Sequence, residues 1–301
     1  MKSTGSWYSV RMESGEVLDC RIKGKFRMKG IKTTNPVAVG DVVEVEVNPD
    51  GAVINRIEDR KNYIIRKSTN LSKEAHIIAA NVDQAVLVVT VNHPVTSTVF
   101  IDRFLASVEA YRIPAILVFN KIDLYDEEDL LLLGALTQIY MQVGYECFHV
   151  SSLTGEGMED VVAALKDKVT VFSGLSGVGK SSLINRVEPG LKLKVAEISD
   201  SHDTGKHTTT FAEMFPLSFG GYIVDTPGMR AFGLIHMEKI EISHYFPEIF
   251  KRASECRFYN CTHIHEPGCA VLEAVEKGEI SESRYFSYVS MFEEGDEKYR
   301  K

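Results

Sequence analysis

The sequence predicts an α/β protein built from three consecutive parts. The first part is rich in short β-branched segments, the middle part alternates buried strands with helices, and the last part is helical and cysteine-rich. These patterns are typical of a small β-barrel, a parallel sheet covered by helices and a metal-stabilised module, respectively. We expect the parts to span residues 1–66, 67–237 and 238–301.

The first part predicts an antiparallel barrel of the oligonucleotide-binding (OB) type. Gly, Asn and Pro turns separate its short alternating segments, which are WYSVRM, EVLDCRI, VGDVVEVEV and AVINRIE. The stretch CRIKGKFRMKG interleaves Lys and Arg with a Phe, which suits an RNA-binding face. A solvated edge strand protected by Lys is the other interpretation, and the sequence leaves both open.

Composition and charge exclude several classes of protein. The 301 residues are 44% hydrophobic and 25% charged, and no apolar run reaches the roughly 18 residues of a membrane helix. The start of the chain lacks the apolar region of a signal peptide, so we expect a cytoplasmic protein with no membrane partner. The net charge of −8 argues against a general polyanion binder.

The middle part predicts a mostly parallel sheet covered on both faces. Its apolar strand segments alternate with helical ones, and residues 67–80 are expected to be a linker. The expected strands are DQAVLVVTV, AILVFN, YECFHVSS, VTVFSG and GYIVDTPG. The expected helices are TVFIDRFLASVEAY, DEEDLLLLGALTQIYMQV, MEDVVAALKD and KSSLINRV.

A phosphate-binding loop lies between one of these strands and the following helix. GLSGVGKS fits G-x-x-x-x-G-K-[ST], in which glycines let backbone N–H groups turn toward the phosphates at a helix N-terminus. The Lys supplies a charge to the β- and γ-phosphates, and the first Ser hydroxyl is a Mg²⁺ ligand. The expected nucleotide-binding residues are Gly174, Leu175, Ser176, Gly177, Val178, Gly179, Lys180, Ser181 and Ser182.

Two further loops at strand ends predict guanine recognition. In NKID, a carboxylate at Asp123 can accept hydrogen bonds from guanine N1–H and N2–H₂, Asn120 can reach the N7/O6 edge, and Lys121 can cover the ring. SSLTGEG follows the next strand and offers backbone groups to guanine O6. The expected base-binding residues are Asn120, Lys121, Ile122, Asp123, Ser151, Ser152 and Leu153.

The segments GKHTTT and DTPG are expected to be the two switches of the site. Thr208, Thr209 and Thr210 are all candidates for a Mg²⁺ ligand, with Thr209 favoured. Asp225 is expected to hold Mg²⁺ through water, and the N–H of Gly228 to sense the γ-phosphate.

The second switch does not identify the residue that orients the attacking water. Met229 stands where many GTPases place a glutamine, and a thioether cannot orient water. His207 is the proposed replacement, against the alternative that it merely packs or faces solvent.

The order of these motifs is base, base, phosphate, switch I, switch II. Ordinary small GTPases run from phosphate through the switches to the base. A parallel sheet with neighbouring termini can be cut in one loop and joined at its old ends without moving the site. The sequence therefore predicts a circularly permuted P-loop GTPase domain.

The last part contains a pattern of metal ligands. Cys256-x4-Cys261-x-His263-x5-Cys269 offers three thiolates and one imidazole, a closed tetrahedral set for one structural Zn²⁺. His265 is the competing imidazole and is expected to face solvent or to support the site. Helices HYFPEIFKRASE and AVLEAVEKG should flank this loop, and the last ten residues should fray.

Taken together, the barrel, NKID, GLSGVGKSS, GKHTTT, DTPG and the Cys/His run resemble the ribosome small-subunit-dependent GTPase A family (RsgA or YjeQ) across the chain. The resemblance implies an OB fold, a permuted GTPase domain and a zinc domain. It also implies GTP hydrolysis stimulated by the 30S subunit in its late maturation, with 16S rRNA as a partner. We expect a monomer that uses Mg²⁺ with GTP. The alternative is an rRNA-binding scaffold that is insensitive to nucleotide and turns over negligibly.

Overall fold

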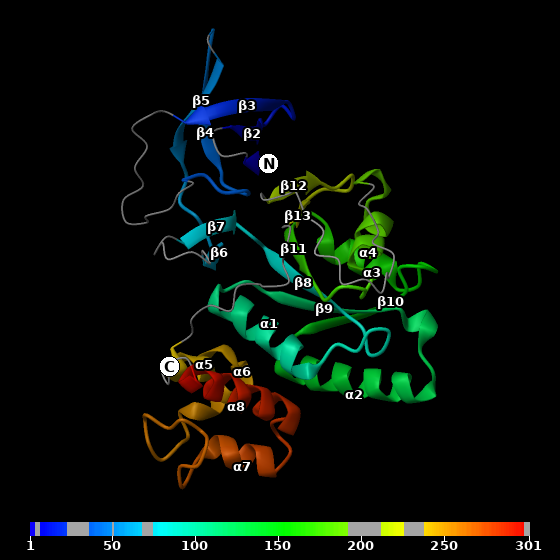
Figure 1. Ribbon diagram of the computed structural model, residues 1–301, viewed down its shortest axis with the longest axis vertical. Helices are drawn as coiled ribbons and strands as arrows, with labels where there is room; N and C mark the ends of the chain where they lie inside the picture. Colours follow the sequence, from blue (N-terminus) through cyan, green and yellow to red (C-terminus); the bar gives the residue numbers. More distant parts are fainter. Residues whose placement is uncertain are drawn as a thin grey trace. The chain divides into compact units, whose positions relative to one another are not determined.

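The computed structural model of the chain, whose helices and strands are labelled in Figure 1, divides into two compact units that are described separately below. The first unit comprises Met1–Val86, Met158–Gly174 and Lys180–Gly233, and the second comprises Leu87–Gly157, Leu175–Gly179 and Leu234–Lys301. The residues that the structure describes are 1–3, 7–22, 36–49, 51–67, 75–191, 212–225 and 238–297.

The N-terminal strands of the first unit form a sheet around a small apolar core. Their order across the sheet is β1 (Lys2–Ser3), β2 (Tyr8–Arg11), β3 (Val17–Ile22), β5 (Gly51–Ile57) and β4 (Val43–Asn48). The core contains Tyr8, Cys20, Val37 and Ile54. All four expected strand segments are present.

One pairing in this sheet differs from the antiparallel expectation. Strands β3 and β5 run parallel, whereas β4 and β5 are antiparallel. Parallel neighbours cannot be joined by a hairpin and need a crossover connection, and here the chain between β3 and β5 includes β4. The expectation of an antiparallel barrel is therefore wrong for this pair.

A two-stranded sheet follows, where the sequence predicted a linker. Strand β6 (Tyr63–Lys67) pairs antiparallel with β7 (Ala75–Ala80). Ile77 and Ala80 of β7 pack with Ala38, so burial against a distant segment makes this short run a strand. The linker expectation is wrong for residues 75–80.

The rest of the first unit contains the helix that follows the phosphate loop. Strand β11 (Val169–Ser173) pairs parallel with β13 (Tyr222–Asp225), and β13 pairs antiparallel with β12 (Glu213–Pro216). Strand β12 in turn pairs with β1. Helices α3 (Met158–Leu165) and α4 (Lys180–Val187) pack against each other.

The second unit holds the strands that carry the base loops. Strand β8 (Gln84–Val89) begins in the first unit and ends in the second, where the order is β10 (Glu146–Val150), β9 (Ala115–Asn120) and β8. Helices α1 (Thr98–Ala110) and α2 (Glu127–Val143) pack on β9 and β10, respectively. Every residue of β8 and β9 is buried, as expected for the interior of a covered parallel sheet.

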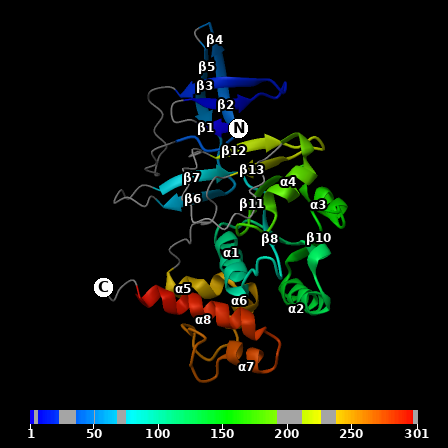
Figure 2. The ribbon, with the colours of Figure 1, turned by 45° about the vertical axis from the view of Figure 1, so that its right-hand side comes forward.

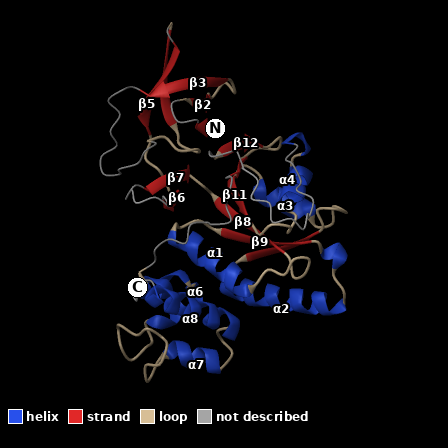
Figure 3. Cartoon of the chain, in the orientation of Figure 1, coloured by secondary structure: helices blue, strands red, loops and turns tan. Residues whose placement is uncertain are grey.

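The C-terminal helices also belong to the second unit. They are α5 (Lys239–Ile242), α6 (Pro247–Ala253), α7 (Ala270–Glu276) and α8 (Glu282–Glu297). Figures 2 and 3 show α8 running beside α1, and the core between them includes Phe246, Tyr288 and Ala106 of α1. Helix α8 extends to Glu297 and so includes the first six of the last ten residues, which the sequence predicted to fray.

Candidate functional site

The phosphate loop lies where the sequence predicted it, directly after β11 and before α4. Three of its glycines, Gly174, Gly177 and Gly179, have φ angles of +154°, +87° and +88°. Side chains other than glycine rarely adopt these conformations, so the glycines allow the loop to turn. Lys180 and Ser181 then form the first turn of α4.

Asn120 connects three loops of the site. Its side chain is fully buried, and its Nδ2 donates to the carbonyl oxygen of Val178 at 2.8 Å and to Oγ of Ser152 at 3.2 Å. Its Oδ1 accepts from the backbone N–H of Ser152 at 3.0 Å. Both amide hydrogens are therefore used within the protein, whereas the sequence led us to expect this side chain at the base edge.

The remaining NKID residues directly follow the last residue of β9. Lys121 has a left-handed backbone (φ +68°), and its Nζ donates to the carbonyl oxygen of His93 at 2.6 Å. Burial lowers the pKa of Lys121, and the nearby Asp123 carboxylate opposes this effect. Asp123 itself is exposed in a short 3-10 turn, Ile122–Leu124, so its carboxylate is free to meet a ligand.

Tyr125 is a residue of this site that the sequence analysis missed. Its hydroxyl donates to the carbonyl oxygen of Asn120 at 2.7 Å and accepts from the N–H of Val91 at 2.8 Å. Burial raises the pKa of Tyr125 to about 12, so the hydroxyl stays protonated and can act as a donor. No motif marks this residue, although it lies only two positions after Asp123.

The second base loop is held by its own hydrogen bonds. The N–H of Ser151 donates to the carbonyl oxygen of Glu156 at 3.0 Å, and the Ser151 hydroxyl accepts from the N–H of Thr154 at 3.0 Å. Ser151 is fully buried, whereas Leu153 at the tip is exposed. The loop therefore exposes its tip to solvent, while hydrogen bonds hold the residues at its start.

Several expected site residues lie outside the described residues. These are His207, Thr208, Thr209, Thr210, Gly228 and Met229. Asp225 is described only through its backbone, as the last residue of β13, paired with Glu213 of β12.

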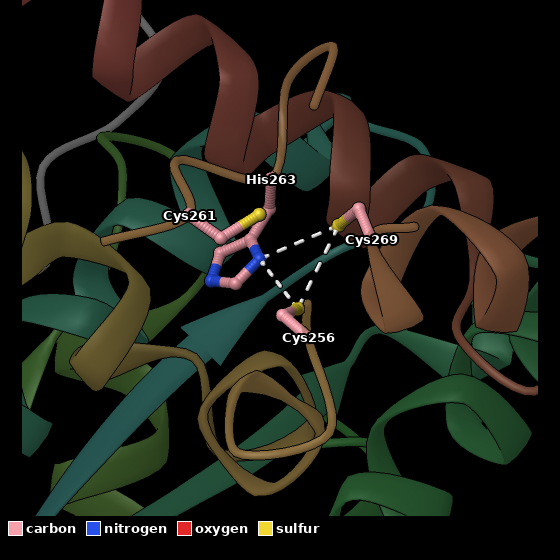
Figure 4. Close-up of side chains that lie close together, drawn as sticks. All are labelled: Cys256, Cys261, His263 and Cys269. Carbon is pink, nitrogen blue, oxygen red and sulfur yellow. Dashed lines mark hydrogen bonds between the residues drawn. The ribbon is translucent and has the colours of Figure 1, made fainter. Parts of the chain in front are cut away.

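The four expected metal ligands come together in the C-terminal segment (Figure 4). The potential ligand atoms of Cys256, Cys261, His263 and Cys269 all lie within 4.8 Å of one another. His263 Nδ1 lies 3.5 Å from the sulfurs of both Cys256 and Cys269, and those sulfurs are 3.9 Å apart. The arrangement is a metal-binding site, and His265 is exposed and outside it.

Surrounding side chains hold the backbone of this metal-binding loop. Tyr285 on α8 donates its hydroxyl to the carbonyl oxygen of His263 at 2.8 Å. The Glu266 carboxylate accepts from the N–H groups of Thr262 at 2.9 Å and Ile264 at 3.2 Å. Burial opposes ionisation of Glu266, but the hydrogen bonds from Thr262 outweigh it and lower the pKa to about 2. No sequence motif marks either of these two supporting residues.

A buried ion-pair cluster ties the C-terminal helices to α1 within the second unit. Arg284 on α8 donates to Asp102 Oδ1 on α1 at 2.8 Å and to the Glu248 carboxylate on α6 at 2.7 and 3.1 Å. The side chains of Arg284 and Asp102 are almost fully buried. Burial lowers the pKa of Arg284, but the carboxylates of Glu248 and Asp102 outweigh it and raise the pKa.

Comparison with known proteins gives matches over the whole chain. A family model described as the RsgA GTPase matches residues 57–235, and one described as the RsgA N-terminal domain matches residues 1–54. A "Small ribosomal subunit biogenesis GTPase RsgA" of Bacteroides fragilis is 60% identical over 100% of this chain and 97% of its own. The protein of the same description from Porphyromonas gingivalis is 58% identical over 100% and 98%.

Two solved structures are similar to the present one. YjeQ from Thermotoga maritima is 43% identical, with a TM-score of 0.78 over 94% of this chain and 91% of its own. YloQ, described as a circularly permuted GTPase, is 31% identical, with a TM-score of 0.78 over 99% and 93%. Among the described residues, no helix is both long and apolar enough to span a membrane.

Proposed function

The chain belongs to the RsgA GTPase family, and we propose that it hydrolyses GTP in the biogenesis of the small ribosomal subunit. It is a circularly permuted GTPase, so its enzymatic reaction is the hydrolysis of GTP to GDP and phosphate. The match with this chain covers 97% and 98% of the length of the two relatives described as small-subunit biogenesis GTPases. The proposed partner is accordingly the small subunit with its 16S rRNA, and stimulation of hydrolysis by that subunit in late maturation is part of the proposal.

The connection made by Asn120 is the observation that best supports this function. Its one side chain links the phosphate loop at Val178 to both base loops. A nucleotide whose base lies at NKID would therefore have its phosphates at GLSGVGKS, as GTP requires. The carboxylate of Asp123 supplies the selectivity for guanine, because adenine lacks the donors that it needs.

The remaining roles follow from the chemistry of each residue. We assign contact with the phosphates to the backbone of Gly174–Gly179 and to Lys180, and coverage of the base to Lys121 and the tip at Ser152 and Leu153. Mg²⁺ would be held by Ser181 and Thr209 and, through water, by Asp225, and it would neutralise charge on the phosphates. The Gly228 N–H would sense the γ-phosphate, and His207 would orient the attacking water.

We also propose that the metal is one structural Zn²⁺. With Zn–S bonds of about 2.3 Å and Zn–N bonds of about 2.0 Å, ligand atoms in a tetrahedron lie roughly 3.5–3.8 Å apart. The separations of 3.5 and 3.9 Å among Cys256, His263 and Cys269 support this ion, and Cys261 lies within 4.8 Å of the other three. All four positions are filled by protein, so the ion stabilises the fold and has no open position for substrate.

The proposal extends to organisation and location. We keep residues 1–66, 67–237 and 238–301 as the RNA-binding, GTPase and zinc-binding domains of a cytoplasmic monomer. Matches of the family models at residues 1–54 and 57–235 support a division close to these limits.

Single-turnover hydrolysis of GTP, with and without purified small subunits, tests the function. Acceleration by the subunits is the expected outcome, and a His207→Ala variant should bind GTP but lose the acceleration. The second candidate, a scaffold with negligible turnover, draws on Met229 in place of a water-orienting glutamine. A chain that binds subunits equally with GDP and with a non-hydrolysable GTP analogue, and shows no acceleration, would favour the scaffold.

A further inference from the structure

The outward face of helix α2 is unusual for a surface helix because it carries no charge beyond its acidic first turn. From Leu130 to Val143 the helix contains no Asp, Glu, Lys or Arg. Its inward face is buried through Leu133, Leu136 and Tyr140. Surface helices normally place charged or polar residues on the opposite face, so the composition here calls for a different explanation.

Exposed apolar residues occupy that outward face. Leu131 is 76% exposed, and Leu130, Leu132 and Met141 are each about half exposed. Residues three and four apart lie on one side of a helix, so Leu131, Ala135, Gln138 and Met141 line a common side. We call the exposed residues of this side beyond the first turn the α2 face: Leu130, Leu131, Leu132, Gly134, Ala135, Gln138, Met141 and Gln142.

The shape of the α2 face suits close approach by another segment. Gly134 and Ala135 lie between the bulky Leu131 and Met141, and a Cβ added at Gly134 would have open space around it. Helices pack with ridges of one entering grooves of the other, and small residues at the crossing shorten the distance between the axes. The α2 face therefore has two exposed bulky apolar side chains with two small residues between them.

The charged side chains in and next to α2 along the chain are all acidic. Residues 122–157 contain no Lys or Arg, while Asp126, Glu127, Glu128 and Asp129 gather at the start of α2. Nucleic acid is bound through cations that neutralise phosphates, so this surface repels RNA. A partner must instead bring positive charge beside an apolar surface.

The same charges argue against a second copy of this chain. Parallel packing of two α2 helices would oppose the carboxylates of both copies. Antiparallel packing would place them at the helix C-terminus of the partner copy, which is the negative end of the helix dipole and carries no basic residue in its last turn.

We propose that the α2 face binds a basic protein segment with an apolar side, contributed by a protein of the small ribosomal subunit. Apolar residues of the segment cover Leu131 and Met141, and its Lys or Arg side chains meet the acidic first turn of α2. This inference rests on the proposed function, and it adds a protein contact to the RNA contacts expected elsewhere on the chain.

Photo-crosslinking with purified small subunits is the first test. A benzophenone amino acid at Gln138 should crosslink to a lysine- or arginine-rich protein segment, and the same group at the exposed Lys277, directly after α7, should not reach that segment. Crosslinking from Gln138 to rRNA, to a second copy or to nothing would overturn the proposal.

Affinity for the subunit gives a second, independent measurement. Leu131→Ala should weaken binding at least about fivefold, as for a residue at the centre of an interface. The matched control is Ile240→Ala, because Ile240 is 71% exposed and lies on another helix of the same unit. GTP hydrolysis without subunits should be unchanged in both variants.

The outcomes of this measurement separate the two proposals. If the unaltered chain does not bind subunits, the proposed function fails and the α2 proposal fails with it. If it binds them and Leu131→Ala binds equally well, the α2 proposal alone is wrong.

Discussion

The side-chain amide of Asn120 donates a hydrogen bond of 2.8 Å to the carbonyl oxygen of Val178, and so joins the NKID loop to the phosphate loop. These residues are 58 positions apart in the chain, in the reverse of the usual order of GTPase motifs. The permutation therefore leaves the connection between base and phosphate loops in place, because a side-chain hydrogen bond depends on position in the fold and not on the direction of the chain.

Gly179→Ala should abolish binding of guanine nucleotides. A Cβ at position 179 would lie 2.3 Å from Asn120 Nδ2, and the φ of +88° is strained for alanine. Either the loop or Asn120 must move, which separates the phosphate and base sites. Gly134→Ala is the control, since its Cβ meets nothing within 4 Å and the helix should gain up to about 1 kcal/mol. Calorimetric titration with GDP measures both, and unchanged affinity in Gly179→Ala would contradict this role of the loop.

Asp123→Asn should shift the nucleotide preference from GTP toward xanthosine triphosphate. The carboxylate offers two acceptors to guanine N1–H and N2–H₂, and an amide replaces one acceptor with a donor, which suits the O2 of xanthine. Competition between the two nucleotides for the variant measures the shift. Guanine selectivity equal to that of the unaltered chain would remove Asp123 from the site.

Tyr125→Phe should weaken both the fold and nucleotide binding. Loss of the hydroxyl leaves the N–H of Val91 and one bond to the Asn120 carbonyl unsatisfied, at a cost of about 1–3 kcal/mol in unfolding free energy. Tyr259→Phe is the control, because Tyr259 is fully exposed. Denaturant unfolding and GDP titration report the two effects. Equal stability of the two variants would show that the Tyr125 hydroxyl is not needed.

Arg284→Met should destabilise the packing of α8 on α1. It leaves the buried carboxylate of Asp102 without its partner, and breaking a buried pair in this way costs about 3–5 kcal/mol. Arg252→Met removes exposed ion pairs with Glu255 and Glu279, which water screens, and should therefore lower the free energy of unfolding far less. Denaturant unfolding compares the variants, and similar losses would contradict a special role for the buried pair.

Metal analysis of the purified chain should give one zinc ion per molecule. Cys261→Ala removes one ligand, and because metal binding supplies folding free energy, residues beyond about 240 should become sensitive to protease. Cys147→Ala, a half-buried cysteine outside the cluster, should keep both the zinc and the protease resistance. A Cys261→Ala variant that remains resistant would show that the metal is not needed for this part of the fold.

The sequence by itself determined the motifs of this protein and their order. GLSGVGKS, NKID and the Cys/His run depend on local features, namely glycine conformations, strand ends and ligand spacing, so they could be recognised without a structure. Most strands and helices of the middle part were predicted for the same reason, because an apolar run or a period of 3.6 residues is visible in a short window.

Only the tertiary structure decided which distant groups meet. Tyr125 supports NKID, Arg284 finds Asp102 across 182 positions, and β7 becomes a strand against β6. In each case burial removes water from the group. A buried polar group then needs a hydrogen-bond partner and a buried apolar group needs a packing partner, and the fold supplies both from distant parts of the chain. Helix α8 shows the same dependence. Its last turns are charged and look like a fraying end, but its buried face packs on α1, and that contact is encoded in neither helix alone.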